Sequence, residues 1–203
     1  MKLLAALAAT LLFVVVLAIV YLVHVRWFTV DVILYAAVAD ALIAVAITLV
    51  AALAARALAP RLLPLGGFEI GLLALIWLLG GWAFAITGPT VLDRSLSIYI
   101  LEKLHQRGGG IREDAIARVF VEEYLPEFRL VDVRLTEQLR SGTIEIRDGC
   151  VRLTPRGERV VAVTDVLRRN LLARNRLLAG VYTDALVDPF ARSRAGVMGY
   201  ECR

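Results

Sequence analysis

Hydrophobic residues follow two different patterns along the chain, and the change comes at Gly88-Pro89. Ahead of that point, three almost purely apolar runs occupy residues 3–23, 32–55 and 68–87. Each run has roughly the 20 residues that a helix needs to cross a hydrocarbon layer about 30 Å thick. We therefore expect residues 1–88 to form a membrane domain with three transmembrane helices.

Beyond the third run, apolar residues recur at the spacing of short amphipathic helices. This pattern predicts helices at about 95–107, 112–125 and 127–140. The first helix precedes the glycine run 108–110, and the third precedes Ser141-Gly142, where a helix readily ends. A soluble domain is therefore expected to start near residue 93.

The hydrophobic period then shortens to two, which is typical of β-strands. Ile144 and Ile146 alternate with charged residues, and so do Val151 and Leu153. The turn-forming pair Asp148-Gly149 lies between the two stretches. These residues predict a β-hairpin with a two-residue turn.

A last helix is expected after the hairpin. Thr154 and Pro155 are favoured as N-cap and first-turn residues, and they predict a helix that starts at Pro155. Its arginine-rich amphipathic pattern continues through residues 164–180, with Gly180 as the expected stop, and residues 181–203 are expected to be an extended tail. Basic amphipathic helices pair with a second helix in a dimer or lie on anionic headgroups.

The order of three helices, a hairpin and a helix resembles the winged helix-turn-helix family over about residues 95–163. Leu139 to Ile144 lead into Val151 to Glu158, and the most specific element is the Leu153-Thr154-x-x-Gly157 turn that closes the wing. The resemblance implies a transcriptional regulator, with its third helix in the DNA major groove and its wing on phosphates. The expected fold class is mostly α: a three-helix transmembrane bundle, an α+β winged-helix-like domain at 93–163 and a C-terminal amphipathic helix.

The charge of this domain lacks the basic excess of a nucleic-acid-binding module. From residue 94 to 164 there are 12 Lys or Arg and 11 Asp or Glu, a net charge of +1. If Leu135 points inward, the outward face of the third helix carries an apolar pair and mixed charges, a surface that suits a protein partner. The residues of this face are Arg129, Leu130, Val133, Glu137 and Arg140. Arg147 and Arg152 on the wing remain compatible with phosphate contact.

In the membrane domain, small residues recur in steps of three and four and so share one face of each helix. They are Ala37, Ala41, Ala44 and Thr48 in the second span, and Gly71, Ala74, Gly81 and Ala85 in the third. In lipid, small residues let helix backbones approach closely. We expect the two faces to pack together or against a partner's helices, although an Ala-rich helix also shows such a face by chance.

Asp40 is the one carboxylate well inside a predicted span, about nine residues from Asp31 at the interface. A charge at this depth costs at least about 2.5 kcal/mol, so the side chain should face protein or water, or be protonated. A carboxyl group hydrogen-bonded within the bundle is favoured over a proton or ion relay or an intersubunit pair, because no second intramembrane charge is predicted in this chain. His24 is expected in the short loop after the first span.

Cys150 and Cys202 are the only cysteines. No Cys-x-x-Cys motif or Cys/His cluster accompanies them. A structural disulfide would require the tail to fold back, so two free thiols in a reducing compartment are favoured. Positive residues near the span ends favour a cytoplasmic soluble domain by only four to three, with the N-terminus outside. We expect a multi-pass protein of a bacterial inner membrane.

The sequence contains no catalytic motif, metal-ligand spacing or phosphate-binding loop, and no cofactor is expected. The expected function is a non-catalytic accessory or scaffold subunit whose soluble domain docks a protein, with a second copy of the chain as another candidate partner. The main alternative is a membrane-tethered DNA-binding regulator. A third hypothesis, a membrane enzyme using Asp40 for proton or lipid chemistry, requires residues from another chain.

Overall fold

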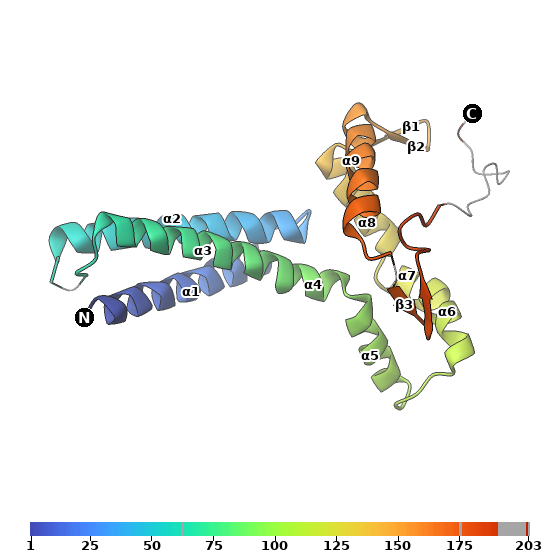
Figure 1. The fold of residues 1–203 in the computed structure, drawn as a ribbon, viewed down its shortest axis with the longest axis horizontal. Helices are drawn as coiled ribbons and strands as arrows, with labels where there is room; N and C mark the ends of the chain where they lie inside the picture. Colours follow the sequence, from blue (N-terminus) through green and yellow to red (C-terminus); the bar gives the residue numbers. More distant parts are fainter. Residues whose placement is uncertain (62, 175, 191–201, 203) are drawn as a thin grey trace. The chain divides into compact units, whose positions relative to one another are not determined.

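The computed structural model describes residues 1–203 except 62, 175, 191–201 and 203. The described chain is mostly helical (Figure 1). It divides into two compact units, Met1–Val131 and Asp132–Arg203. The first unit contains the apolar helices and the first soluble helices. The second contains most of the third soluble helix and the rest of the chain.

Three helices are long and apolar enough to cross a membrane: α1 (Lys2–Trp27), α2 (Ile33–Leu58) and α3 (Gly67–Thr87). The three predicted spans are therefore confirmed, and α1 and α2 extend a few residues beyond the apolar runs. α2 packs against both α1 and α3. A short helix, α4 (Pro89–Arg94), comes after α3 and a break at Gly88, and it packs against α2.

Aromatic rings and one glycine contact form the centre of this bundle. Phe13 of α1 stacks on Trp77 of α3 with ring centroids 5.8 Å apart, and the Trp77 indole N–H donates to Thr10 Oγ1 over 3.1 Å. Where α2 meets α3, a Cβ on Gly81 would lie 2.8 Å from the Cβ of Ala41. The close approach of these two helices therefore depends on the absence of a side chain at Gly81.

Glu69 joins α1 to α3 at the end of the bundle that carries the N-terminus. Its carboxylate accepts hydrogen bonds from the Gly66 backbone N–H and, over 2.7 Å, from Lys2 Nζ. A carboxylate in the first turn of a helix also complements the helix dipole. These contacts fix where α3 begins.

The first soluble helix, α5 (Leu96–Gln106), begins at Ser95, whose hydroxyl accepts a hydrogen bond from Ile98 N over 3.2 Å. A second helical stretch runs past Pro126, although the sequence predicted an end before that proline. A wide π-type turn just ahead of Pro126 shifts the hydrogen-bond register where the proline lacks its N–H. The segments of this stretch are η1 (Glu113–Ala115), α6 (Ile116–Val119), η2 (Phe120–Tyr124) and α7 (Leu125–Glu127).

The third soluble helix, α8 (Leu130–Ser141), comes directly after Arg129, which adopts a left-handed backbone with φ 45°. None of its 12 residues, all of which are described, is buried. The element order agrees with the winged-helix expectation. The identity of the domain as a winged helix is not confirmed, because α8 contributes no buried residue to a core.

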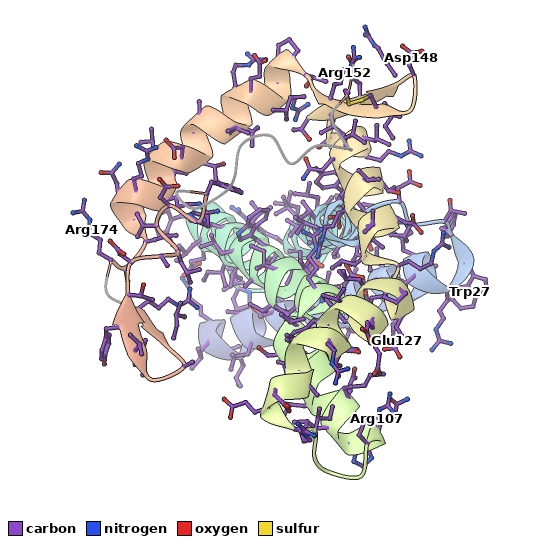
Figure 2. The ribbon with its side chains drawn as sticks, turned by 90° about the vertical axis from the view of Figure 1, so that its right-hand side faces the viewer. Trp27, Arg107, Glu127, Asp148, Arg152 and Arg174 are labelled. Atoms are coloured by element: carbon purple, nitrogen blue, oxygen red, sulfur yellow. A yellow bond between two sulfur atoms is a disulfide. The ribbon has the colours of Figure 1, made fainter. Side chains whose placement is uncertain are left out.

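The predicted β-hairpin is confirmed. β1 (Ile144–Arg147) pairs antiparallel with β2 (Cys150–Leu153), with Ile144 opposite Leu153. Asp148 and Gly149 both have positive φ, as a tight two-residue turn requires. Figure 2 shows Asp148 at the tip of this hairpin.

The helix α9 (Pro155–Leu171) is attached to the hairpin through Thr154 and Gly157. Thr154 Oγ1 accepts a hydrogen bond from Gly157 N over 3.1 Å and donates one to the Gly142 carbonyl over 2.7 Å. Gly157 lies so close to the Thr143 carbonyl that a Cβ would overlap it. The N-cap predicted at Thr154 is therefore confirmed.

The predicted length of α9 is wrong. The helix ends at Leu171 instead of continuing to residue 180, and a second hairpin forms from β3 (Arg176–Leu178) and β4 (Val181–Thr183). Ala179 and Gly180 both have positive φ, so Gly180 belongs to a hairpin turn and not to a helix stop. Most of the expected tail, 191–201 and 203, lies outside the described residues.

The expectation of two free thiols is also wrong. Cys150, at the start of β2, forms a disulfide with Cys202, and their Cα atoms are 5.9 Å apart. The bond ties the end of the chain to the first hairpin. Sequence separation alone did not indicate this pairing, because it requires the tail to return to the hairpin.

Candidate functional site

Asp40 and His24 form a polar pair inside the membrane bundle. Asp40 lies on α2 with only 2% of its surface exposed, and its Oδ1 is 2.7 Å from Nδ1 of His24 on α1. A buried carboxylate needs such a partner, because burial without one strongly disfavours the charged form. The favoured sequence interpretation of Asp40, a carboxyl group hydrogen-bonded within the bundle, agrees with this contact.

His24 is the partner that sequence reasoning missed. It was expected in the first loop, but α1 continues through it to Trp27. His24 and Asp40 lie on either side of the short connection between two helices that must run antiparallel, so their positions could have suggested the contact. The hypothesis of a membrane enzyme that uses Asp40 required partner residues from another chain. The structure shows that a residue of the same chain, His24, contacts Asp40.

The second carboxylate oxygen of Asp40 is left unpaired. Oδ2 is buried and has no hydrogen-bond partner among the residues that the structure describes. Asp40 also lines a cavity of about 440 Å³, whose walls are otherwise mostly apolar. The lining residues are Ile19, Val20, Val23, His24, Phe28, Ala39, Asp40 and Ile43.

The predicted helix-packing residues occupy different environments. Ala37, Ala41, Ala44, Thr48, Gly81 and Ala85 are buried in the bundle. Ala74 is half-buried and Gly71 is exposed, and a Cβ on Gly71 would meet no described atom within 4 Å. Contact between α2 and α3 within the chain therefore centres on Gly81 and not on Gly71.

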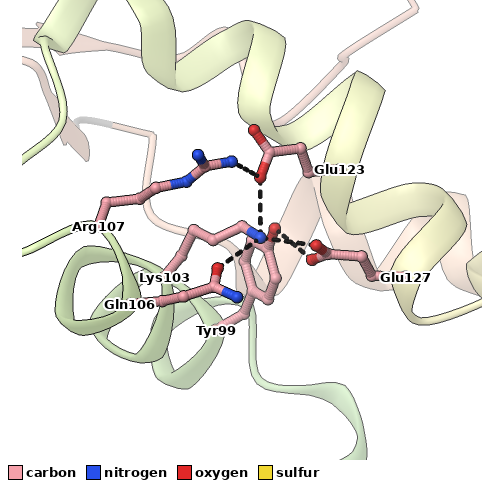
Figure 3. A network of polar contacts seen from close by, with 6 residues as sticks. All are labelled: Tyr99, Lys103, Gln106, Arg107, Glu123 and Glu127. Atoms are coloured by element: carbon pink, nitrogen blue, oxygen red, sulfur yellow. Dashed lines mark hydrogen bonds and ion pairs between the residues drawn. The ribbon is translucent and has the colours of Figure 1, made fainter.

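A second polar site joins α5 to the next helical stretch (Figure 3). Lys103 is only 5% exposed, and its Nζ lies 2.6 Å from Glu127 Oε1 and 2.8 Å from Glu123 Oε2. Arg107 also contacts Glu123 over 2.8 Å, and the Tyr99 hydroxyl donates to Glu127 over 3.0 Å. This network holds the two helices together beside a cluster of aromatic rings: Tyr99, Phe120, Tyr124 and Phe128.

The network sets the ionisation of its members. Hydrogen bonds to Glu123 and Glu127 hold the pKa of Lys103 well above its ordinary value. Hydrogen bonds from Lys103 and Arg107 lower the pKa of Glu123, and the one from Lys103 lowers the pKa of Glu127. Two cations and two carboxylates thus compensate one another's charge.

The predicted docking face of α8 is only partly presented to solvent. Arg129 and Arg140 are exposed, whereas Leu130 and Val133 are half-buried. The Glu137 side chain is 13% exposed and contacts Arg134 over 2.8 Å. The outward face predicted by pointing Leu135 inward therefore differs from the face that the structure exposes. Val131, one helical turn before Leu135, is the most exposed apolar side chain of the helix, at 60%.

The wing arginines also lie in different surroundings. Arg147 forms an ion pair with Glu145 over 2.9 Å on the same strand. Arg152 is exposed and lies opposite Glu145 in the strand register, and Figure 2 shows it on the hairpin. Each wing arginine therefore has a carboxylate on the hairpin as its neighbour.

Apolar side chains remain exposed on the hairpin and along α9. Each of them is between 46% and 59% exposed: Ile146, Val151, Leu153, Val160, Val163, Val166 and Leu167. Val160, Val163 and Leu167 share one side of α9, which we call the α9 face. A hollow of about 530 Å³ on this side is lined by Arg156, Arg159, Val160, Val163 and Thr164.

Among the described residues, no group of three or more His, Cys, Asp or Glu side chains could hold a metal ion. Comparison of the chain with protein-family models, curated proteins and solved structures gave no match.

Proposed function

We propose that the protein is a non-catalytic accessory or scaffold subunit of a bacterial inner membrane. Its three spans anchor it, and its soluble half docks a protein partner. The observation that carries the proposal is the exposed apolar surface of the hairpin and α9. Contiguous apolar surface on a soluble region is typical of interaction sites.

The composition of this surface favours a protein over other partners. The hollow is lined by two valines of the α9 face together with two arginines and a threonine, a mixture of apolar and polar groups that suits a protein interface. We include the exposed residues of the predicted α8 face, Arg129 and Arg140, among the proposed docking residues. The soluble charge is nearly balanced, which fits a protein partner better than a phosphate backbone.

The disulfide indicates on which side of the membrane the soluble half lies. Charge counting favoured the cytoplasm by a single residue, whereas disulfides persist in oxidising compartments. We therefore place the soluble half on the oxidising side of the membrane, with the N-terminus on the cytoplasmic side. This reverses the orientation expected from the sequence.

The alternative function is a membrane-tethered DNA-binding regulator. It is favoured by the exposed arginines Arg152 and Arg156 beside the hairpin. It also requires a cytoplasmic soluble half. Salt-dependent retention of the full chain on duplex DNA would support this alternative, and no retention at low salt would support the docking proposal.

Photo-crosslinking in the native membrane tests the docking proposal. A photoreactive amino acid at Val163 should yield one discrete adduct with a second, different polypeptide. Val160→Glu with Leu167→Glu should abolish the adduct by placing carboxylates on the α9 face, whereas Ala162→Glu on the opposite side of the helix should leave it unchanged. Adducts with lipid alone would contradict the proposal.

A further inference from the structure

The unpaired oxygen of Asp40 and the cavity that Asp40 lines together indicate a binding site within the membrane. Asp40 Oδ1 is occupied by His24, Oδ2 has no partner among the described residues, and Asp40 is one of the residues that line the cavity. A buried acceptor without a donor is unfavourable, so a ligand that brings a donor gains from the contact. Apart from His24, the remaining walls of the cavity are apolar.

The donor set restricts the class of ligand. A Ca²⁺ or Mg²⁺ ion needs about six oxygen ligands, and the cavity lining offers a single carboxylate. A buried water molecule needs two to four polar partners, and apolar walls do not provide them. The complement of a buried carboxylate oxygen is a positively charged N–H group carried on an apolar body.

We propose that the cavity between α1 and α2 binds the ammonium head of a membrane amphiphile, with the ammonium donating to Asp40 Oδ2.

The position of the cavity explains why the ligand is amphiphilic. Ile19, Ile43 and Val23 are at least 40% exposed on helices that span the membrane, so the cavity opens towards lipid. His24 lies within one helical turn of Trp27, an interfacial residue type. An amphiphile in the same leaflet would therefore hold its ammonium near the level of the site and its chain along the apolar wall.

The test is binding of radiolabelled dodecylamine to the full chain in phosphatidylcholine nanodiscs. Unlabelled dodecylamine should compete, while dodecanol, which lacks the charge, and dodecyltrimethylammonium, which lacks the N–H, should compete about tenfold or more weakly. Equal competition by dodecanol would show a purely apolar site and overturn the proposal. Equal competition by dodecyltrimethylammonium would show that no N–H donor is recognised and would also overturn it.

Substitutions locate the site. Asp40→Asn is isosteric and can keep a hydrogen bond to His24, yet it removes the charge and should weaken dodecylamine binding about tenfold or more. Ala39→Phe, at an exposed wall position, should block the cavity sterically. Glu69→Gln, at the other end of the bundle, is the matched control and should bind as the wild type does. Unchanged affinity in Asp40→Asn or Ala39→Phe would overturn the proposal.

Phosphatidylethanolamine nanodiscs distinguish the source of the ammonium. If this lipid reduces dodecylamine binding through Asp40, the natural ligand class is an aminophospholipid headgroup. If dodecylamine binds equally well in both lipids, the ligand class is a free single-chain amine. Both outcomes support recognition of an ammonium, provided that binding depends on Asp40.

Discussion

At the residue scale, Gly81 and Gly157 occupy contacts in which a side chain has no room. Gly81 lies against Ala41 where α2 meets α3, and Gly157 lies against the Thr143 carbonyl where α9 meets the hairpin. Each glycine therefore sets the distance between two elements. Glycines elsewhere, such as Gly71 and Gly110, have no described atom within 4 Å of an added Cβ.

Gly81→Val should destabilise the bundle by about 1–3 kcal/mol, because the new side chain forces α2 and α3 apart. Denaturant titration in detergent micelles, followed by tryptophan fluorescence, measures this change. Gly71→Ala is the control and should be neutral or slightly stabilising, since alanine is the better helix former. Equal effects of the two substitutions would contradict the packing described for α2 and α3.

Gly157→Ala should loosen the junction between α9 and the hairpin, again by about 1–3 kcal/mol. Hydrogen exchange in β1, β2 and the first turn of α9 reports this opening directly. Gly110→Ala provides the comparison, because its surroundings are open and it has no positive φ. Unchanged protection of the hairpin in Gly157→Ala would refute the tight contact with Thr143.

At the element scale, the contact between α5 and α7 depends on Lys103 and its two glutamates. Glutamates whose pKa is lowered by folding stabilise the folded state above their ordinary pKa of about 4.3, and they lose this contribution as the pH falls through the lowered value. Lys103 has a raised pKa, so its contribution is complete below about pH 10.4 and declines only at higher pH. The network is therefore fully formed at neutral pH.

Lys103→Met keeps much of the side-chain length but removes the charge between Glu123 and Glu127. We expect the near-ultraviolet circular dichroism of the tyrosine cluster to change between pH 7 and pH 3 in the wild type. The variant should show a reduced signal at pH 7 and a weaker dependence on pH. A variant with the same acid transition as the wild type would show that this network does not order the aromatic cluster.

Elements set by local rules were predictable from the sequence, and those set by distant contacts were not. The spans, the Asp148-Gly149 turn and the Thr154 cap depend on neighbouring residues, and all three were predicted. The helix end at Leu171 was missed because leucines and arginines on both sides suit a helix, whereas the Ala179-Gly180 turn selects a hairpin. The predicted outward face of α8 was wrong in part, because it was set by the assumption that a single residue, Leu135, points inward.

The candidate site was predictable only in part. Asp40 was identified because a carboxylate in an apolar run is conspicuous, but its partner His24 and its cavity depend on how α1 lies against α2. The Cys150–Cys202 disulfide likewise joins residues far apart in sequence. Such pairings depend on the folded arrangement, which periodicity does not encode.

At the scale of the whole molecule, the disulfide predicts the compartment of the soluble half. In intact cells, a membrane-impermeant maleimide should label Cys150 and Cys202 only after treatment with an impermeant reductant. Labelling without reductant would show free thiols, and no labelling after reduction would place the soluble half in the cytoplasm. Either result would contradict the proposed orientation.

At the same scale, we propose that the membrane bundle anchors a soluble half that carries an interaction surface. Native mass spectrometry of the full chain, extracted from its own membrane in lipid nanodiscs, tests it most directly. The predicted result is an assembly containing a different polypeptide, lost in the Val160→Glu, Leu167→Glu variant and retained in Ala162→Glu. Detection of the chain alone, or only of its own copies, would contradict the claim.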